Sequence, residues 1–201
     1  MIVNDPATYV FVHVPKTGGQ SIKHLLAHVH PTRYKAHTTA AQIRDLLPAS
    51  ASYFRFAFVR NPWDRLLSLY SFLCQKRMNP LAGEDWDQED FRHRGFKWWL
   101  LENEWQPPFA RGLGWPPGQK LCQLHYLADE RGVLLVDFVG RTESLTADVA
   151  RIAGRVGIPE TDVPRINSST HASYRAAYDD EMVAFVARHH AADIERFGYA
   201  F

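Results

Sequence analysis

Apolar residues recur along this chain at strand spacing and then at helix spacing. The segment from Tyr9 to Val14 is apolar, β-branched and aromatic, which predicts a strand buried on both faces. Pro15 ends that strand, and a glycine turn follows it. A helical pattern begins at about Gln20. The expected apolar face of this helix consists of Ile22, Leu25, Leu26 and Val29.

A second strand and helix are predicted between Tyr53 and Cys74. Phenylalanines at positions 54, 56 and 58 alternate with other residues, and Arg60 ends the strand. Asn61 is a favourable N-cap and Pro62 a favourable first helical residue, so a helix is expected to start there. Its buried stripe should consist of Trp63, Leu66, Leu67, Tyr70 and Cys74, which leaves Arg65 and Ser68 on other faces.

The same alternation continues to the end of the chain. Thr38 or Thr39 can cap a helix that carries Ile43, Leu46 and Leu47 and is ended by Pro48. The segment 132–140 predicts a buried strand ending near Asp137. A helix closed by Gly157 should follow it, and a terminal helix should span about 179–197. The fold class is therefore α/β, a parallel sheet with helices on both faces.

Length and charge narrow the class of protein. With 201 residues and 46% hydrophobic content, the chain suits a single domain over 1–201, with an insertion at about 78–120. The net charge of +1 gives no global field that would favour nucleic acid. Cys74 and Cys122 are too few for a disulfide framework, which favours a reducing compartment. Without a long apolar run or room for a signal peptide, we expect a cytoplasmic protein with no membrane span.

The turn after the first strand has the features of an anion site. Lys16, Thr17, Gly18 and Gly19 form the turn, and Gln20 and Ser21 open the helix. Free N–H groups and the helix dipole favour a phosphate there, and glycine allows close approach. Because the lysine precedes the glycines, the G-x-x-x-x-G-K-[ST] pattern of nucleoside triphosphatases is absent. An ordinary strand–turn–helix with a chance lysine is the alternative.

The second strand ends in another candidate anion site. Arg60 stands at the strand end before a helix N-terminus, and its guanidinium suits bidentate phosphate binding. Ser68 can donate from a position two turns into the helix. The alternative is that Arg60 pairs with Asp64 or with a carboxylate elsewhere.

Together the two motifs resemble a known family. FVHVPKTGGQS followed by RNPWDRLLSLY resembles the carbohydrate, heparan 2-O-sulfotransferase-like branch of the sulfotransferases, the sulfotransferase family 2 type. VDFVGRTESL and the closing DIERFGY resemble that family too, so the resemblance covers most of the chain outside 78–120. It implies the P-loop-like sulfotransferase fold. Gln20 departs from the family pattern, which usually has threonine there.

The resemblance implies the donor and the roles of several residues. The donor is 3′-phosphoadenosine 5′-phosphosulfate (PAPS), with its 5′-phosphosulfate on residues 16–21 and its 3′-phosphate on Arg60 and Ser68. Sulfuryl transfer needs a base for the acceptor hydroxyl, and His37 matches a family histidine in the loop after the first helix. Lys16 would stabilise the leaving oxygen. No metal is expected. Taken without the family, the position of His37 in a polar loop favours a solvent-exposed histidine.

Several alternatives remain open from the sequence. The apolar run ending in Asp137 imitates a Walker B segment, which would favour a nucleotide-dependent kinase. A non-catalytic nucleotide- or glycan-binding module is a third possibility. The segment 78–120 carries five of the six tryptophans and either covers an acceptor or forms a local core. The segment 165–174 resembles the family's loop over the nucleotide. The acceptor (a sugar, a glycolipid or a small metabolite) and the oligomeric state are not determined.

Overall fold

The structure is a computed structural model that describes residues 1–27, 33–34, 38–75, 88–102, 122–158, 163 and 173–201. The chain divides into two compact units, Met1–Arg60 with Gln123–Ser168 and Asn61–Cys122 with Ser169–Phe201. The single domain over 1–201 that the sequence suggests stays a prediction.

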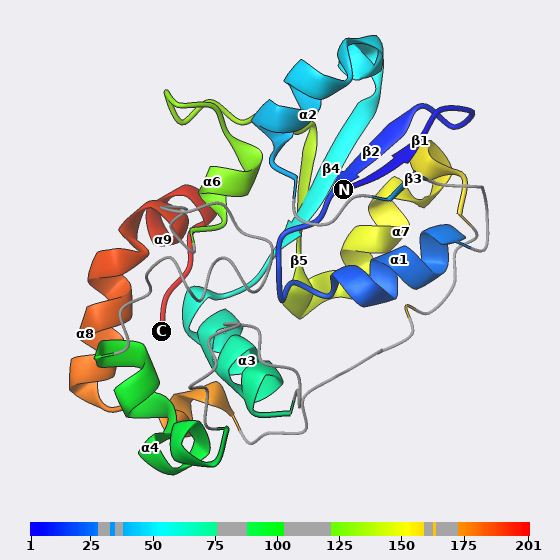
Figure 1. Cartoon of the computed structure of the whole chain (residues 1–201). Coiled ribbons are helices and arrows are strands. Elements are labelled where there is room, and N and C mark those ends of the chain that lie inside the picture. The colour runs from blue at the N-terminus through cyan, green and yellow to red at the C-terminus, as the bar shows by residue number, and fades with distance from the viewer. Residues whose placement is uncertain (28–32, 35–37, 76–87, 103–121, 159–162, 164–172) are drawn as a thin grey trace. The chain divides into compact units, whose positions relative to one another are not determined.

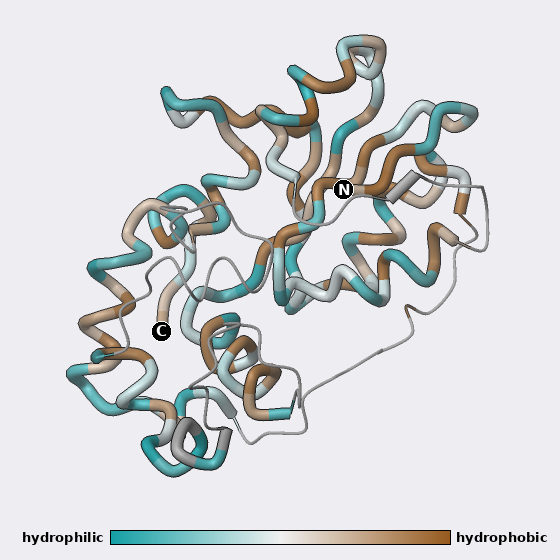
Figure 2. Tube along the Cα trace, viewed as in Figure 1, coloured by the Kyte–Doolittle hydropathy of each residue, from teal (hydrophilic) through white to brown (hydrophobic). Residues whose placement is uncertain are grey.

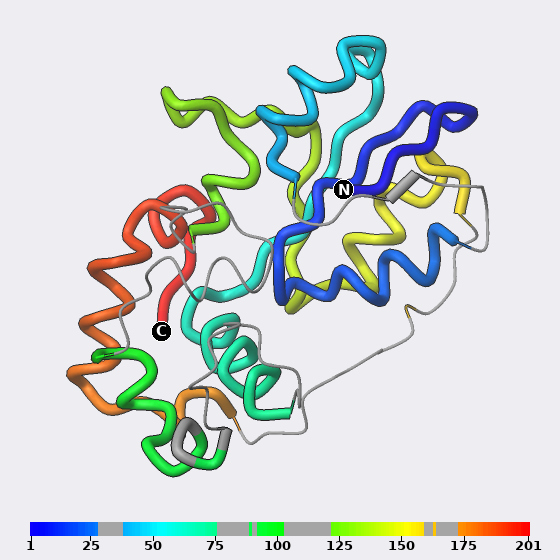
Figure 3. Tube along the Cα trace, viewed as in Figure 1, coloured from blue at the N-terminus to red at the C-terminus, as the bar shows by residue number. Residues whose placement is uncertain are grey.

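The first unit is built on a five-stranded sheet in the order β3-β1-β2-β4-β5 (Figure 1). The strands are β1 (Ile2–Asn4), β2 (Tyr9–Val12), β3 (Arg33–Tyr34), β4 (Phe54–Val59) and β5 (Phe138–Arg141). β2, β4 and β5 are parallel, whereas β1 is antiparallel to both β2 and β3. Figure 3 shows β2 beside β4, although these strands are far apart along the chain. The fold is therefore mixed α/β, and β2 and β4, the strands that precede the two candidate anion sites, pair directly.

The sheet differs from the prediction at β1 and at β5. β1 was not predicted, because three residues are too few to show a period. The predicted strand over 132–140 was placed wrongly, because β5 begins after Asp137 instead of ending there. Val133 is exposed and Asp129 N donates to its carbonyl, so the apolar run opens with a turn and only its last part joins the sheet.

Helices cover both faces of this sheet. They are α1 (Gly19–Ala27), α2 (Ala40–Leu46), α6 (Leu124–Leu127) and α7 (Leu145–Val156), with the short 3₁₀ helices η1 (Pro48–Ser52) and η2 (Thr142–Ser144). α1 and α7 lie on one side of the sheet and α2 on the other (Figure 1). The core under α1 and α7 includes Phe11, Phe56 and Phe58 from the strands, with Ile22 and Ile152 from the helices. Figure 2 shows β1 and β2 mostly in the brown of hydrophobic residues.

Two helix ends confirm the signals in the sequence. Thr39 caps α2, with its side chain accepting from Gln42 N at 3.2 Å while Gln42 Oε1 accepts from Thr39 N at 3.0 Å. Gly157 ends α7 in the left-handed region at φ 70°. Leu46, expected to help anchor α2, is instead exposed.

The second unit is helical. Its helices are α3 (Pro62–Gln75), α4 (Gln88–Leu101), η3 (Tyr174–Ala177), α8 (Asp180–His189) and α9 (Ala191–Phe197). The predicted N-cap of α3 is confirmed, since Asn61 Oδ1 accepts from Trp63 N at 3.1 Å. The single terminal helix expected over 179–197 is wrong, because the backbone leaves helical geometry at His190 and two helices form. Over the described residues, none of the helices is both long and apolar enough to cross a membrane.

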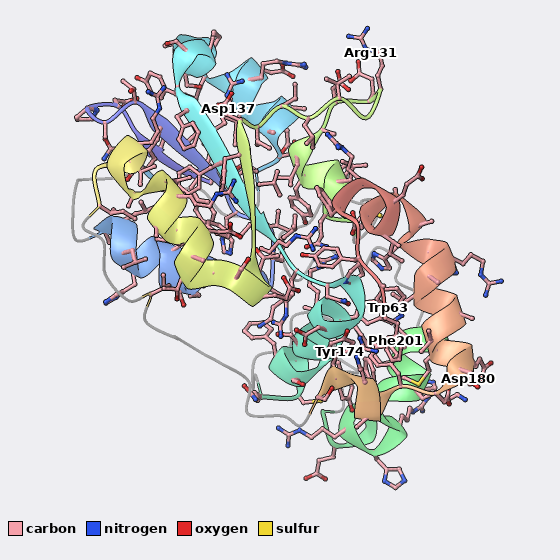
Figure 4. All side chains as sticks on the ribbon, turned by 180° about the vertical axis from the view of Figure 1, so that it is seen from behind. Trp63, Arg131, Asp137, Tyr174, Asp180 and Phe201 are labelled. Atoms are coloured by element: carbon pink, nitrogen blue, oxygen red, sulfur yellow. The ribbon has the colours of Figure 1, made fainter. Side chains whose placement is uncertain are left out.

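Aromatic packing holds the second unit together. Phe201 lies 5.6 Å from Trp63 and 5.7 Å from Tyr174, measured between ring centroids, and Figure 4 shows the three side chains gathered together. Trp99 of α4 is buried against Tyr70 at 5.7 Å, so at least this tryptophan of the 78–120 insertion belongs to a core. The other insertion tryptophans, except the half-buried Trp98, lie outside the described residues.

Candidate active site

Two loops leave the sheet at the same edge. β2 and β4 are parallel neighbours, with Tyr9 opposite Phe54 and Val12 opposite Ala57. The segment after each strand therefore emerges from the carboxyl edge, where parallel α/β sheets bind ligands. The first of these segments contains Lys16, and the second begins at Arg60.

The loop after β2 is wound tightly by two left-handed residues. Lys16 has φ 67° and Gly18 has φ 77°, with the buried Thr17 between them. Such a conformation is unfavourable for lysine, so the surrounding contacts must hold it. The Thr17 hydroxyl donates to Val14 O at 2.9 Å, which closes the loop onto the strand end. Because the Thr17 hydroxyl already donates its proton to Val14 O, Thr17 can donate to an anion through its backbone N–H.

The first turn of α1 follows directly from this loop. Ser21 N and Ile22 N donate to Gly18 O at 3.0 and 3.3 Å, so the helix begins at Gly19. The earliest N–H groups of a helix have no partner within it, and they carry the positive end of its dipole. Gln20 is exposed and Ser21 is buried, so the two side chains predicted to bind the anion have different surroundings.

Gly19 is needed for space. A Cβ added there would lie 1.9 Å from Nε2 and 2.1 Å from Cδ2 of His13. The buried His13 ring stacks on Phe11, with centroids 5.7 Å apart. The imidazole therefore supports the first turn of α1 from the side of the strand. The sequence alone could not show that the His13 ring and Gly19 are in contact.

We expect Gly19→Ala to destabilise the protein by about 1–3 kcal/mol, because the new methyl group would enter the His13 ring. Thermal or urea unfolding measures the loss. Gly154→Ala is the matched control, since a Cβ there meets nothing within 4 Å and should leave the stability equal or slightly higher. Adding His13→Ala to Gly19→Ala should restore part of the loss. Equal destabilisation in both glycine variants would contradict this explanation.

The turn between β5 and α7 packs against the same loop. A Cβ on Gly18 would lie 3.3 Å from Leu145 Cδ2, so the close approach of the β5–α7 turn favours glycine at position 18. The positive φ of Gly18 favours glycine as well. The Thr142 hydroxyl donates to Val59 O at 3.1 Å and ties the turn to the end of β4. These contacts give the segment GRTESL a physical role in shaping the site.

A buried carboxylate stiffens that turn. Asp148 Oδ2 accepts from Arg141 N at 2.8 Å and from Ser144 Oγ at 2.7 Å, and Asp148 Oδ1 accepts from Arg151 Nη1 at 2.9 Å. Burial alone would raise the pKa of this carboxyl, but the three hydrogen bonds and the charge of Arg151 together hold the pKa below its usual value. Asp148 is thus ionised at neutral pH and braces the turn.

Arg60 is held at both its backbone and its side chain. Gln123 Oε1 accepts from Arg60 N, and Gln123 Nε2 donates to Arg60 O, both at 2.8 Å. The Arg60 guanidinium donates from Nη1 to Lys16 O at 3.4 Å. The guanidinium therefore lies beside the Lys16 loop within the first unit. Gln123 carried no periodic or motif signal that would have found it in the sequence.

The remaining predicted residues fall elsewhere. Ser68 is buried on α3 of the second unit, so its pairing with Arg60 on one phosphate stays a prediction. His37 and residues 165–172 lie outside the described residues.

Asp137 lies beside the amino end of β4, where its carboxylate accepts from Arg55 N at 2.7 Å, and Figure 4 shows it where β5 begins. A Walker B aspartate would stand at the carboxyl end, so this geometry opposes the kinase interpretation.

A buried group of possible metal ligands lies in the second unit. One ligand atom from each of Cys122, His190 and Asp193 falls within 4.8 Å of the others. Burial raises the pKa of the Cys122 thiol to about 11, and burial lowers the pKa of His190, so thiol and imidazole are neutral at neutral pH. The positive charge of the buried Arg65 acts on both groups. A metal cation would require Cys122 to bind as a thiolate, and the cation would then lie close to the positive charge of Arg65. We therefore interpret Cys122, His190, Asp193 and Arg65 as a group of buried polar residues that stabilises the core.

Similarity to known proteins agrees with this geometry. The site defines a general class, an α/β protein with a tight glycine loop before a helix N-terminus at the carboxyl edge of its sheet. The family model described as "Sulfotransferase family" matches residues 1–200. The chain therefore belongs to the sulfotransferase family, of the family 2 type.

Two individual proteins are similar as well. An uncharacterized protein from Archaeoglobus fulgidus is 27% identical over 123 residues, which cover 61% of this chain and 83% of that protein. The crystal structure of a sulfotransferase from Alicyclobacillus acidocaldarius aligns with 81% of this chain at 16% identity, with a TM-score of 0.32. The alignment spans 60% of that protein, which is less than two thirds of its length. That likeness is too slight to place individual residues.

Proposed function

We propose that this protein transfers the sulfuryl group of PAPS to a hydroxyl of a carbohydrate or another small acceptor. The observation that carries the proposal is the contact between Arg60 Nη1 and Lys16 O at 3.4 Å. It brings a guanidinium suited to the 3′-phosphate next to the loop suited to the 5′-phosphosulfate. One doubly phosphorylated adenosine could then touch both groups.

The residues have distinct parts in the proposed reaction. The acceptor oxygen attacks sulfur in line and loses its proton to His37, while the bond from sulfur to the bridging phosphate oxygen breaks. Negative charge then develops on that bridging oxygen. Lys16 and the N–H groups of residues 18–20 would stabilise it, leaving adenosine 3′,5′-bisphosphate as the product. No step requires a metal ion.

Arg60→Ala tests the proposed donor. We expect it to weaken binding of adenosine 3′,5′-bisphosphate by about 10- to 100-fold, because charge-assisted hydrogen bonds to the 3′-phosphate are lost. Binding of adenosine 5′-monophosphate, which lacks that phosphate, should barely change. Isothermal titration calorimetry measures both. Arg44→Ala is the matched control, since it removes the same charge from an exposed position on α2. If both nucleotides weaken equally in Arg60→Ala, Arg60 is only structural.

The acceptor and the location remain parts of the proposal. Trp99 is buried, so any aromatic surface for a sugar would have to come from other tryptophans of the 78–120 insertion. Cys74 and Cys122 are free thiols, which agrees with the reducing cytoplasm that we propose as the location. Sulfate transfer to any acceptor would exclude the alternative of a non-catalytic binding module.

A further inference from the structure

The Gln123 side chain forms a two-point hydrogen bond with the backbone of Arg60. Its carboxamide oxygen accepts from Arg60 N and its nitrogen donates to Arg60 O, both at 2.8 Å. A carboxamide carries the same donor and acceptor as a peptide group, so Gln123 extends the hydrogen bonding of β4 by one residue. Its side chain is completely buried.

This contact lies just where the sheet ends. The ladder between β4 and β5 closes with Val59 opposite Arg141, so Arg60 is the first residue beyond it. Polar backbone groups at such a position need partners, and Gln123 satisfies both. Because Gln123 fixes the backbone of Arg60, it also limits the positions that the long Arg60 side chain can reach.

Gln123 is itself held firmly. It precedes α6, and Tyr126 N donates to Gln123 O at 2.9 Å. Tyr126 and Leu127 on this short helix are buried and anchor the segment in the first unit. The carboxamide is therefore presented from a fixed backbone.

We propose that Gln123 is a positioning residue, which fixes the Arg60 backbone and thereby sets where the guanidinium meets the 3′-phosphate of the donor. This inference rests on the proposed function. Arg60 Nη1 also donates to Lys16 O, so Gln123, Arg60 and the Lys16 loop form one connected chain of contacts. Gln123 would thus act on the affinity gained from the 3′-phosphate without touching the nucleotide.

Two variants test the inference. Gln123→Met keeps the length of the side chain and removes both hydrogen bonds. Gln123→Glu keeps the shape, but its ionised carboxylate can only accept, so it would face Arg60 O with a second acceptor. The protonated carboxyl both donates and accepts, and burial raises the pKa of such a group. Gln123→Glu should therefore regain function as the pH falls.

The readout is the ratio of affinities for adenosine 3′,5′-bisphosphate and adenosine 5′-monophosphate, measured by calorimetry. We expect Gln123→Met to reduce this ratio by about 5- to 100-fold. Gln123→Glu should reduce it at about pH 8 and recover toward the wild-type ratio at about pH 5. Each value is divided by that of the wild type at the same pH, which removes the titration of the nucleotide phosphates. Melting temperatures are recorded in parallel.

The outcomes separate the inference from the function on which it rests. If both nucleotides weaken equally in Gln123→Met, or Gln123→Glu shows no recovery at low pH, Gln123 is only structural and the inference fails. A wild-type protein that does not distinguish the two nucleotides would overturn the proposed donor itself. Should Gln123→Met fail to fold, the inference is tested by Gln123→Glu alone. The normalised affinity ratio of this one variant is then compared between about pH 8 and about pH 5.

Discussion

Lys16→Asn should slow sulfuryl transfer by about 10²- to 10³-fold, because it removes the ammonium group that we propose stabilises the leaving oxygen. Asparagine is chosen since it tolerates a left-handed backbone better than most residues, and Lys16 has φ 67°. The hydrogen bond from Arg60 goes to the Lys16 backbone and should survive the change. The expected loss is therefore one of charge, with the loop intact.

Transfer is measured with PAPS labelled at sulfur, using a cell extract as the source of acceptors. Lys23→Asn is the control, since it removes the same charge from a position within α1, away from the loop. Its rate should stay within a few-fold of the wild type. A Lys16→Asn protein that transfers sulfate as fast as this control would remove Lys16 from the catalytic role.

His37→Ala should lower turnover by about 10²- to 10⁴-fold, the usual contribution of a general base. Binding of adenosine 3′,5′-bisphosphate should be unchanged, because that product carries no acceptor hydroxyl. His37 lies outside the described residues, so the expectation comes from the family resemblance and from imidazole chemistry.

His24→Ala, at an exposed position on α1, is the matched control for the loss of a histidine. Turnover and calorimetric affinity are measured on the same preparations. Normal turnover with weakened nucleotide binding would show that His37 acts on the ligand and would exclude it as the base.

Local signals in the sequence were enough to find the elements that build the site. The buried run at Tyr9, the phenylalanine alternation ending at Val59 and the Asn61 cap each depend on neighbouring residues. A parallel sheet was predicted, and β2 and β4, the strands that precede the two candidate anion sites, are parallel neighbours. Gly157 likewise marked the end of α7 correctly.

What the sequence could not predict depends on contacts between distant segments. Gln123 meets Arg60 across 63 positions, and no local pattern marks a buried glutamine. Gly19 was interpreted as allowing close approach to an anion, whereas the structure shows that it also leaves space for the His13 ring. The break at His190 interrupts a continuous helical pattern, and β5 begins later than its apolar run. In each case tertiary packing overrode the local preference.

One titration of the wild-type protein tests the proposed donor most directly. Adenosine 3′,5′-bisphosphate is compared with ATP in the presence of Mg²⁺ and with adenosine 5′-monophosphate, under the same buffer and salt. The proposed function predicts that the bisphosphate binds without magnesium and more tightly than either of the other nucleotides. Magnesium-dependent binding of ATP, with no preference for the bisphosphate over the monophosphate, would contradict it.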